Sequence, residues 1–204
     1  MKFLPLLSAA LLSTVFCVSI HAQHDQQAAG YNHSEIDEIA SAVLPLPEAY
    51  REGATVLGYD ENGAVVVIRD GGNGLYCLAD KPGDDRFQAV CYHESLEPFM
   101  ARGRELRAQG LTGKAVLEKR HEEIDEGLLQ APTAGSILYN MMMDLEDFDP
   151  ETATPALYAI YTPYATEAST GLASQPPAPG GPWIMRAGTA SAHIMVVIPN
   201  KHDH

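Results

Sequence analysis

The 204-residue chain has few basic residues, few cysteines and a single tryptophan. Lysine and arginine number 13 against 27 aspartates and glutamates, which gives a formal net charge of −14 at pH 7. So acidic a chain lacks the basic surface that nucleic acids and anionic membranes require, and we predict no nucleic-acid partner. Hydrophobic residues still make up 46% of the chain, which is ordinary for a globular protein and excludes wholesale disorder.

Sequence motifs for several common chemistries are also missing. There is no G-x-S-x-G nucleophile elbow and no G-x-x-x-x-G-K-[ST] phosphate-binding loop. The acidic turns at 60–63 and 144–149 lack the alternating ligands and the distal glutamate of an EF-hand. Cysteines at C-x-x-C spacing, which a zinc site would favour, are absent too. The sequence therefore indicates no particular cofactor.

The first 22 residues have the pattern of a secretory signal peptide. Lys2 supplies a basic start, residues 3–20 carry no charge, and the small Ala22 precedes polar sequence. A membrane anchor is the alternative, because 18 uncharged residues approach the length of a transmembrane helix, but Pro5 weakens it. We predict cleavage after Ala22, with residues 23–33 as a polar N-terminal extension. The mature protein is then secreted or periplasmic, without a stable membrane anchor.

Two cysteines, Cys77 and Cys91, remain once the predicted signal peptide and its Cys17 are removed. Export leads to an oxidising compartment, where two cysteines favour one disulfide with a single possible connectivity. A pair of buried free thiols is the alternative. We expect the Cys77–Cys91 disulfide.

Short strands dominate the first half of the predicted domain, residues 34–199. A helix is expected to begin at Ser34 and to stop at Pro45. Four runs rich in β-branched and aromatic residues follow, separated by turns rich in glycine and aspartate. We expect these runs to form an antiparallel meander in which Cys77 faces Cys91 across the last two strands. The runs are 54–59, 64–69, 75–78 and 87–92, and the turns are 60–63, 70–74 and 81–85.

The second half begins with two helices and then returns to strands. Pro98 lies in the first turn of one helix and Gly110 ends it, while Thr112 caps the next. The sequence therefore predicts an α+β fold, a single domain with a mostly antiparallel sheet and two to three helices, followed by a C-terminal tail at 200–204. The helices are expected at 95–109 and 112–126, and the strands at 137–143, 157–162 and 194–198.

Residues 163–192 show neither helical nor strand periodicity. Prolines and glycines fill 175–182, and so long an irregular stretch inside a domain is usually a functional loop or a linker. Trp183, the only tryptophan, lies within it and favours packing against the body. We expect a lid over a cleft, with a merely superficial loop as the alternative.

His93 and His193 are placed at junctions between elements, whereas His121 is expected on a solvated helix face. Glu94 and Glu97 follow His93 closely, and a histidine with a carboxylate can transfer protons or bind a divalent metal. These four residues are candidate catalytic groups, and the two histidines are candidate metal ligands. Capping of the following helix and a backbone hydrogen bond are the alternative. If the two strands run antiparallel, both histidines lie at one end of the sheet and share a site.

Arg102, Arg104 and Arg107 form the densest basic cluster of this acidic chain. Guanidinium groups clamp carboxylates and phosphates, so Arg102 and Arg104, together with Trp183 of the loop, are candidate ligand-binding residues. Pairing with nearby acids such as Glu105 is the alternative.

The stretch 92–104, YHESLEPFMARGR, resembles a group of uncharacterised secreted bacterial proteins. The likeness extends over 54–126 and again over 182–183 and 192–195. The resemblance implies a bacterial envelope or secreted protein and no particular reaction.

Three functions fit these observations. A small-ligand or partner-binding envelope protein, with its cleft under residues 163–192, is the preferred hypothesis. A metal-dependent or hydrolase-like enzyme centred on His93 and His193 is the second. A structural or stress-related secreted domain is the third, because a fold does not determine a function.

Overall fold

A computed structural model describes residues 36–83 and 85–198 of the chain. The predicted signal peptide, the polar extension at 23–33, the predicted cap Ser34 and the tail at 200–204 lie outside the described residues. Among the described residues, no helix is both long and apolar enough to cross a membrane.

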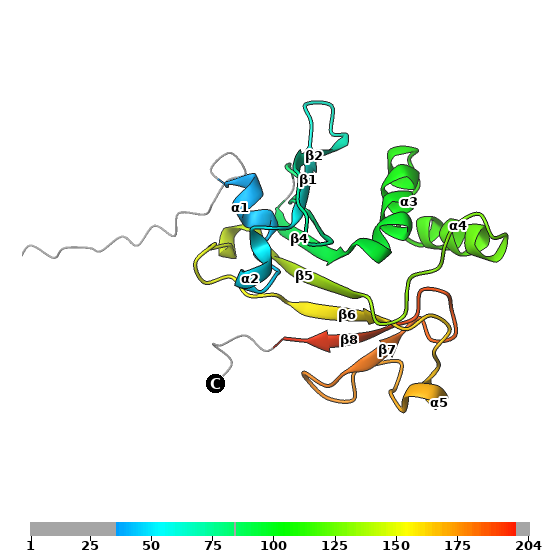
Figure 1. Cartoon of the computed structure of the whole chain (residues 1–204). Coiled ribbons are helices and arrows are strands. Elements are labelled where there is room, and N and C mark those ends of the chain that lie inside the picture. The colour runs from blue at the N-terminus through cyan, green and yellow to red at the C-terminus, as the bar shows by residue number, and fades with distance from the viewer. Residues whose placement is uncertain (1–35, 84, 199–204) are drawn as a thin grey trace, which may run out of the picture.

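The fold is α+β, as predicted, and is built on one sheet of eight strands (Figure 1). The strands lie side by side in the order β2-β1-β3-β4-β5-β6-β8-β7, so β2 and β7 form the two edges. All neighbours pair antiparallel except β1 and β3. The strands are β1 (Thr55–Tyr59), β2 (Val65–Arg69), β3 (Leu75–Leu78), β4 (Arg86–His93), β5 (Ile137–Asp144), β6 (Leu157–Tyr161), β7 (Trp183–Met185) and β8 (His193–Val197).

The parallel pair of β1 and β3 corrects the expected meander. β2 does pair with β1 as a hairpin, but the chain then crosses the start of β1 and adds β3 on its other side. Glycine makes this crossing possible, because a Cβ on Gly71 would lie 2.3 Å from backbone atoms of Ala54 and Thr55. The crossing segment is held by hydrogen bonds from the Gly72 and Asn73 N–H groups to the Gly53 carbonyl, at 2.9 and 3.2 Å.

Helices cover both faces of the sheet (Figure 1). The short α1 (Glu38–Ala42) and α2 (Glu48–Arg51) lie on one face, with the disulfide and the buried Ala42 and Leu46. The longer α3 (Glu97–Ala108) and α4 (Gly113–Asp125) cover the other, packing Phe99 against Tyr92 and Tyr161. Five α-helices are present in the described chain, two of them long, with α5 (Glu167–Thr170) and the 3-10 turns η2 (Glu94–Leu96) and η3 (Leu145–Asp147) completing the set.

The first helix begins later than the sequence indicated. Asp37, and not a residue near 34, caps α1: its carboxylate accepts a hydrogen bond from the Ala40 N–H at 3.0 Å. The helix is only five residues long, since the chain turns at Val43 two residues before Pro45.

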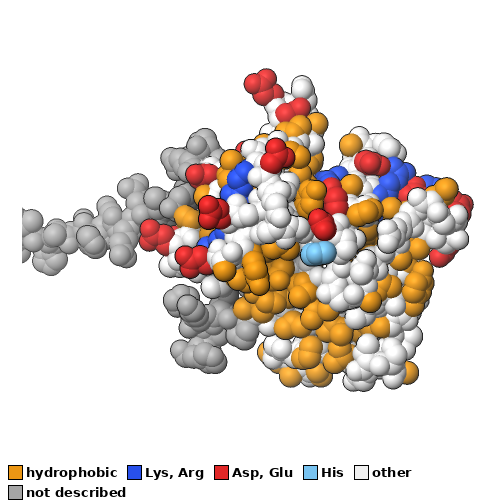
Figure 2. Space-filling model, viewed as in Figure 1, with side chains coloured by type: hydrophobic (Ala, Val, Ile, Leu, Met, Phe, Trp, Pro, Cys, Tyr) orange, Lys and Arg blue, Asp and Glu red, His pale blue; other side chains and the backbone are white. Residues whose placement is uncertain are grey.

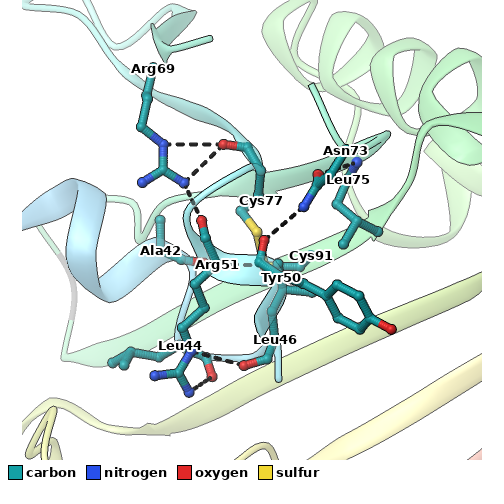
Figure 3. Close-up of a disulfide and its surroundings, with 11 residues drawn as sticks. Ala42, Leu44, Leu46, Tyr50, Arg51, Arg69, Asn73, Leu75, Cys77 and Cys91 are labelled. Carbon is teal, nitrogen blue, oxygen red and sulfur yellow. Dashed lines mark hydrogen bonds between the residues drawn. A yellow bond between two sulfur atoms is a disulfide. The ribbon is translucent and has the colours of Figure 1, made fainter. Parts of the chain in front are cut away.

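The predicted disulfide is confirmed. Cys77 on β3 lies directly opposite Cys91 on β4, with 4.0 Å between the Cα atoms, and both side chains are fully buried. Figure 3 shows the bond beneath α1 and α2, where Arg69 and Arg51 donate to backbone carbonyl groups. This corner of the molecule is therefore held by one covalent cross-link and by side chains that tie β2 and α2 to their neighbours.

The 163–192 segment has more regular structure than its sequence indicated. It contains α5 and the edge strand β7, which pairs with β8 and places Trp183 opposite Met195. Its two ends are tied to each other, because the Thr162 and Tyr164 N–H groups donate to the carbonyls of Ala192 and Thr189, both at 2.8 Å. The segment thus adds one short strand to the edge of the sheet.

Candidate functional site

The strand registers separate the two histidines that the sequence placed together. His93 ends β4 and His193 begins β8, so both lie at the same end of the sheet as expected, but β5 and β6 run between these strands. Three strand spacings amount to roughly 14 Å. Across the four strands, Tyr92 lies opposite Leu138, Leu138 opposite Ala159, and Ala159 opposite Met195. Met195 is two residues from His193 along β8.

The pleat also directs the two imidazoles to opposite faces. Side chains alternate along a strand, so His193 shares the face of Met195 and Tyr92, whereas His93, next to Tyr92, lies on the other. The expectation of a shared His93–His193 site was wrong for this reason. In addition, nowhere within residues 36–83 and 85–198 are three or more His, Cys, Asp or Glu side chains placed to hold a metal ion.

His193 is a packed core histidine. It is 5% exposed, lies 5.2 Å from the Tyr161 ring centroid, and its Nδ1–H donates to the Ser191 carbonyl at 2.8 Å. Burial lowers the pKa of this imidazole, so it is neutral near pH 7. His121, which was expected in solvent, is also engaged, because its Nε2 lies 2.8 Å from Ser191 Oγ. Together they tie α4 and the start of β8 to the end of the 163–192 segment.

His93 instead lies at the rim of a pocket. Its Nδ1 accepts the Ser95 N–H at 3.2 Å and lies 2.9 Å from Ser95 Oγ, which in turn lies 2.5 Å from Ser136 Oγ. The pocket has a volume of about 360 Å³ and is also lined by Leu75 and Tyr139. Here the capping alternative considered for His93 holds, because the imidazole caps η2.

The two candidate glutamates do not join His93. Glu97 accepts a hydrogen bond from the Tyr92 hydroxyl at 2.6 Å and pairs with Arg104, on the opposite face of the sheet. The carboxylate of Glu94 lies near Gly74, 3.4 Å from where a Cβ would stand.

The candidate arginines Arg102 and Arg104 are both paired with carboxylates, whereas Arg107 is not paired with one among the described residues. Arg102 is occupied by carboxylates, at 2.7 Å from Glu123 and 2.8 Å from Glu105, so it links α3 to α4. Arg104 donates to the Tyr92 hydroxyl at 2.8 Å and pairs with Glu97. These contacts fix the position of the Arg104 guanidinium beside the sheet. Arg107 forms no ion pair with a described residue, and its Nη1 donates to the Gly103 carbonyl at 3.1 Å.

A groove runs along these arginines, between α3 and the sheet face formed by β1, β3 and β4. It consists of two adjoining hollows with volumes of about 480 and 400 Å³ that share Tyr59, Lys81, Arg104 and Arg107. Figure 2 shows basic side chains in the notch between the β1–β2 hairpin and α3. The apolar lining consists of Ala64, Val65, Leu78, Ala79, Val90, Met100, Ala101 and Ala108, and Arg86, Asp80, Gln88, Glu105 and Tyr92 complete the polar part.

Positive charge is concentrated in this groove. Four basic residues line it against the two acids Asp80 and Glu105, although the chain as a whole carries −14, and one of the four, Arg104, is paired with Glu97. Burial raises the pKa of the Tyr59 hydroxyl, which Asp80 raises further while Arg104 and Arg107 lower it. Burial likewise raises the pKa of Tyr92 well above its usual range. Both phenols are therefore neutral hydrogen-bonding groups at pH 7.

A second guanidinium lies behind Arg107. Arg120 reaches from α4 across the Phe99 ring, 3.8 Å from its centroid, and donates to the Phe99 carbonyl at 3.0 Å. A Cβ on Gly103 would lie 3.0 Å from Arg120 Nη1 and 3.2 Å from Arg107 Nη1, so glycine leaves room for both groups. Burial lowers the pKa of Arg120 to about 10, and Arg107 contributes to this as a like charge. Arg120 therefore adds to the positive potential beside the groove.

The loop that carries Trp183 does not cover either hollow. The groove and the His93 pocket are lined by residues of 59–108 and of 75–139, and no described residue of 163–192 contributes to them. The cleft expected under this loop is therefore neither of these two hollows, and it stays a prediction. Tyr59, Lys81 and Ser136 were not among the predicted site residues, because tertiary structure brings them to these sites and they carry no motif of their own.

No family model, curated protein or solved structure matches the chain in the comparisons made. The geometry of the groove and of the His93 pocket is thus the basis for any functional inference.

Proposed function

We propose that this chain is an exported bacterial ligand-binding protein that holds a small amphipathic acid in the α3 groove. The observation that carries the proposal is the collection of Lys81, Arg86, Arg104 and Arg107 around one groove of a strongly acidic protein. The Cys77–Cys91 disulfide supports export, because such bonds persist in oxidising compartments.

The arrangement of Arg104 and Arg107 favours an anionic group. Arg104 is held in place by Glu97 and Tyr92, and Arg107 has no carboxylate partner among the described residues. A guanidinium offers paired N–H donors that match a carboxylate, and charge-assisted bonds of this kind are the stronger ones. A ligand carboxylate beside Arg107 supplies the partner that the chain itself does not provide.

The rest of the groove favours an apolar body on that acid. Val90 and Leu78 on the sheet and Met100 on α3 line its inner part. Hollows of about 400 and 480 Å³ fall in the range of small-molecule sites, which combine apolar walls with a few placed polar groups. A medium-chain fatty acid or an aromatic carboxylate has this combination of charge and apolar surface.

Calorimetric titration of the mature protein with octanoate tests the proposal. We expect saturable binding of one octanoate, and at least tenfold weaker binding by Arg107→Gln, because a hydrogen bond to a charged group contributes about 1.5–3 kcal/mol. Lys114→Gln is the matched control, since it removes the same charge from an 85% exposed side chain on α4. Its affinity should stay within twofold of the unmodified protein.

Octan-1-ol provides the second comparison, because it keeps the chain and lacks the carboxylate. It should bind at least tenfold more weakly than octanoate. Equal affinities of octanoate for Arg107→Gln and the unmodified protein, or no binding at millimolar octanoate, would contradict the proposal.

A further inference from the structure

The pocket at His93 contains a chain of hydrogen bonds whose direction can be assigned. The Ser95 N–H can only donate, so His93 Nδ1 is the acceptor and the neutral imidazole carries its proton on Nε2. Ser95 Oγ–H must then donate to Nδ1, at 2.9 Å. Ser136 Oγ–H in turn donates to Ser95 Oγ, at 2.5 Å. The proton of Ser95 is thus directed at a base.

Burial and shape distinguish this series of hydrogen bonds from a capping interaction alone. Ser136 is 7% exposed and holds Ser95 through the 2.5 Å contact between their hydroxyl oxygens, while His93 is exposed. A pocket of about 360 Å³ opens over both serines and is walled by Leu75, Ile137 and Tyr139. A serine hydroxyl bonded to a histidine nitrogen beside an apolar pocket supplies the nucleophile and the base that acyl transfer uses.

We propose that Ser95 is a nucleophile, with His93 as its general base, for esters of small apolar carboxylic acids. Ser95 Oγ forms a bond to the ester carbonyl carbon while its proton passes to His93 Nδ1, which then releases the hydrogen bond from the Ser95 N–H. Ser136 Oγ–H turns to the carbonyl oxygen as that atom becomes negative. The bond from the carbonyl carbon to the leaving oxygen then breaks, and His93 Nδ1 returns the proton to that oxygen to release the alcohol.

Water completes the cycle by the same path. It gives a proton to His93 Nδ1 as its oxygen attacks the acyl carbon. The bond to Ser95 Oγ breaks, and that oxygen takes the proton back, so the acid is released and the serine restored. The apolar walls suit an acyl group of a few carbons, such as butyryl.

Covalent labelling with an alkyl fluorophosphonate tests this site on the mature protein. The reagent reacts with activated serines, so intact mass should show one adduct and peptide mapping should place it on Ser95. Ser95→Ala should abolish the adduct. His93→Gln should slow labelling by about a hundredfold or more, in line with the contribution of a general base. Hydrolysis of p-nitrophenyl butyrate should be lost in the same variants.

His121 and Ser191 provide the matched control, because they form a second Ser–His contact of 2.8 Å in which Ser191 is fully buried. His121→Gln should leave both the adduct and the ester hydrolysis unchanged. Absence of an adduct in the unmodified protein, or its placement on any residue other than Ser95, would overturn the proposal. Mapping the adduct on the unmodified protein needs no substitution, so this test remains valid even if Ser95→Ala fails to fold.

The acyl-transfer site and the α3 groove lie on opposite faces of the sheet, so the two proposals fail independently. Fluorophosphonate labelling of Ser95 should proceed at the same rate in Arg107→Gln. A parallel loss of labelling and octanoate binding in that variant would contradict the separation of the two sites.

Discussion

The Cys77–Cys91 disulfide should supply a large part of the stability of this fold. The two residues are 14 apart in sequence, so the bond closes a loop of about 15 residues, for which the loss of chain entropy on cross-linking corresponds to about 3 kcal/mol. For a chain of this length, 1 kcal/mol shifts the melting temperature by about 2–4 °C. Replacing both cysteines by alanine should therefore lower the melting temperature by about 6–12 °C.

Scanning calorimetry of the double variant and of the unmodified protein measures this difference. Adding dithiothreitol to the unmodified protein should produce a similar decrease, and adding it to the variant should produce none. Thiol titration supplies an independent check, because both cysteines are fully buried and cross-linked. Two reactive thiols in the unreduced, denatured protein, or a melting temperature within about 2 °C of the variant's, would refute this reasoning.

Three further predictions concern the packing that positions the two sites. Gly71→Ala should cost about 1–3 kcal/mol in urea unfolding through its clash with the backbone of β1, whereas Gly72→Ala, with open space around it, should stay within about 0.5 kcal/mol. Phe87→Ala should cost about 3–5 kcal/mol, because the ring is fully buried, and a change below 1 kcal/mol would contradict its place in the core. Since burial lowers the folded-state pKa of His193, the resulting stability is fully present above its unfolded value of 6.5 and is lost as the pH falls further. His193→Asn, which keeps a donor for the Ser191 carbonyl, should show a shallower fall in melting temperature from pH 7 to 5.5 than the unmodified protein, and equal slopes would exclude this role.

The elements that local pattern specifies were predicted well. Helices α3 and α4 start and end within a few residues of their expected positions. Pro98, Gly110 and Thr112 mark helix ends through their own backbone preferences, which do not depend on distant contacts. The disulfide was predicted from the two cysteines that remain after export. Their facing positions followed from the turn between β3 and β4, which makes those two strands a hairpin whatever the rest of the sheet does.

The order of the strands could not be obtained in the same way. The segment 70–74 reads as a turn, and a turn is equally compatible with a hairpin or with a crossing over β1. The choice depends on contacts of Gly71 with Ala54 and Thr55, which are distant in sequence. Strand β7 escaped prediction because three residues are too short for a periodic signal, and its pairing comes from β8.

The candidate sites show the same limit. The sequence correctly predicted that His93 and His193 lie at one end of the sheet. The two strands between them, and the opposite faces on which their side chains lie, can be predicted only when strand order and register are known. Arg104 was recognised from its cluster of charge, whereas Tyr59 and Lys81 complete the groove from strands and turns 20 or more residues away. Ser136 reaches Ser95 only because β5 pairs with β4.

The most direct test of the ligand-binding account is a crystal structure of the mature protein with saturating octanoate. The account predicts that the carboxylate lies within hydrogen-bond distance, about 2.7–3.2 Å, of the Arg107 guanidinium and that the alkyl chain lies on Val90 and Met100. Octanoate bound elsewhere, or an empty groove at a concentration that saturates the calorimetric signal, would contradict it.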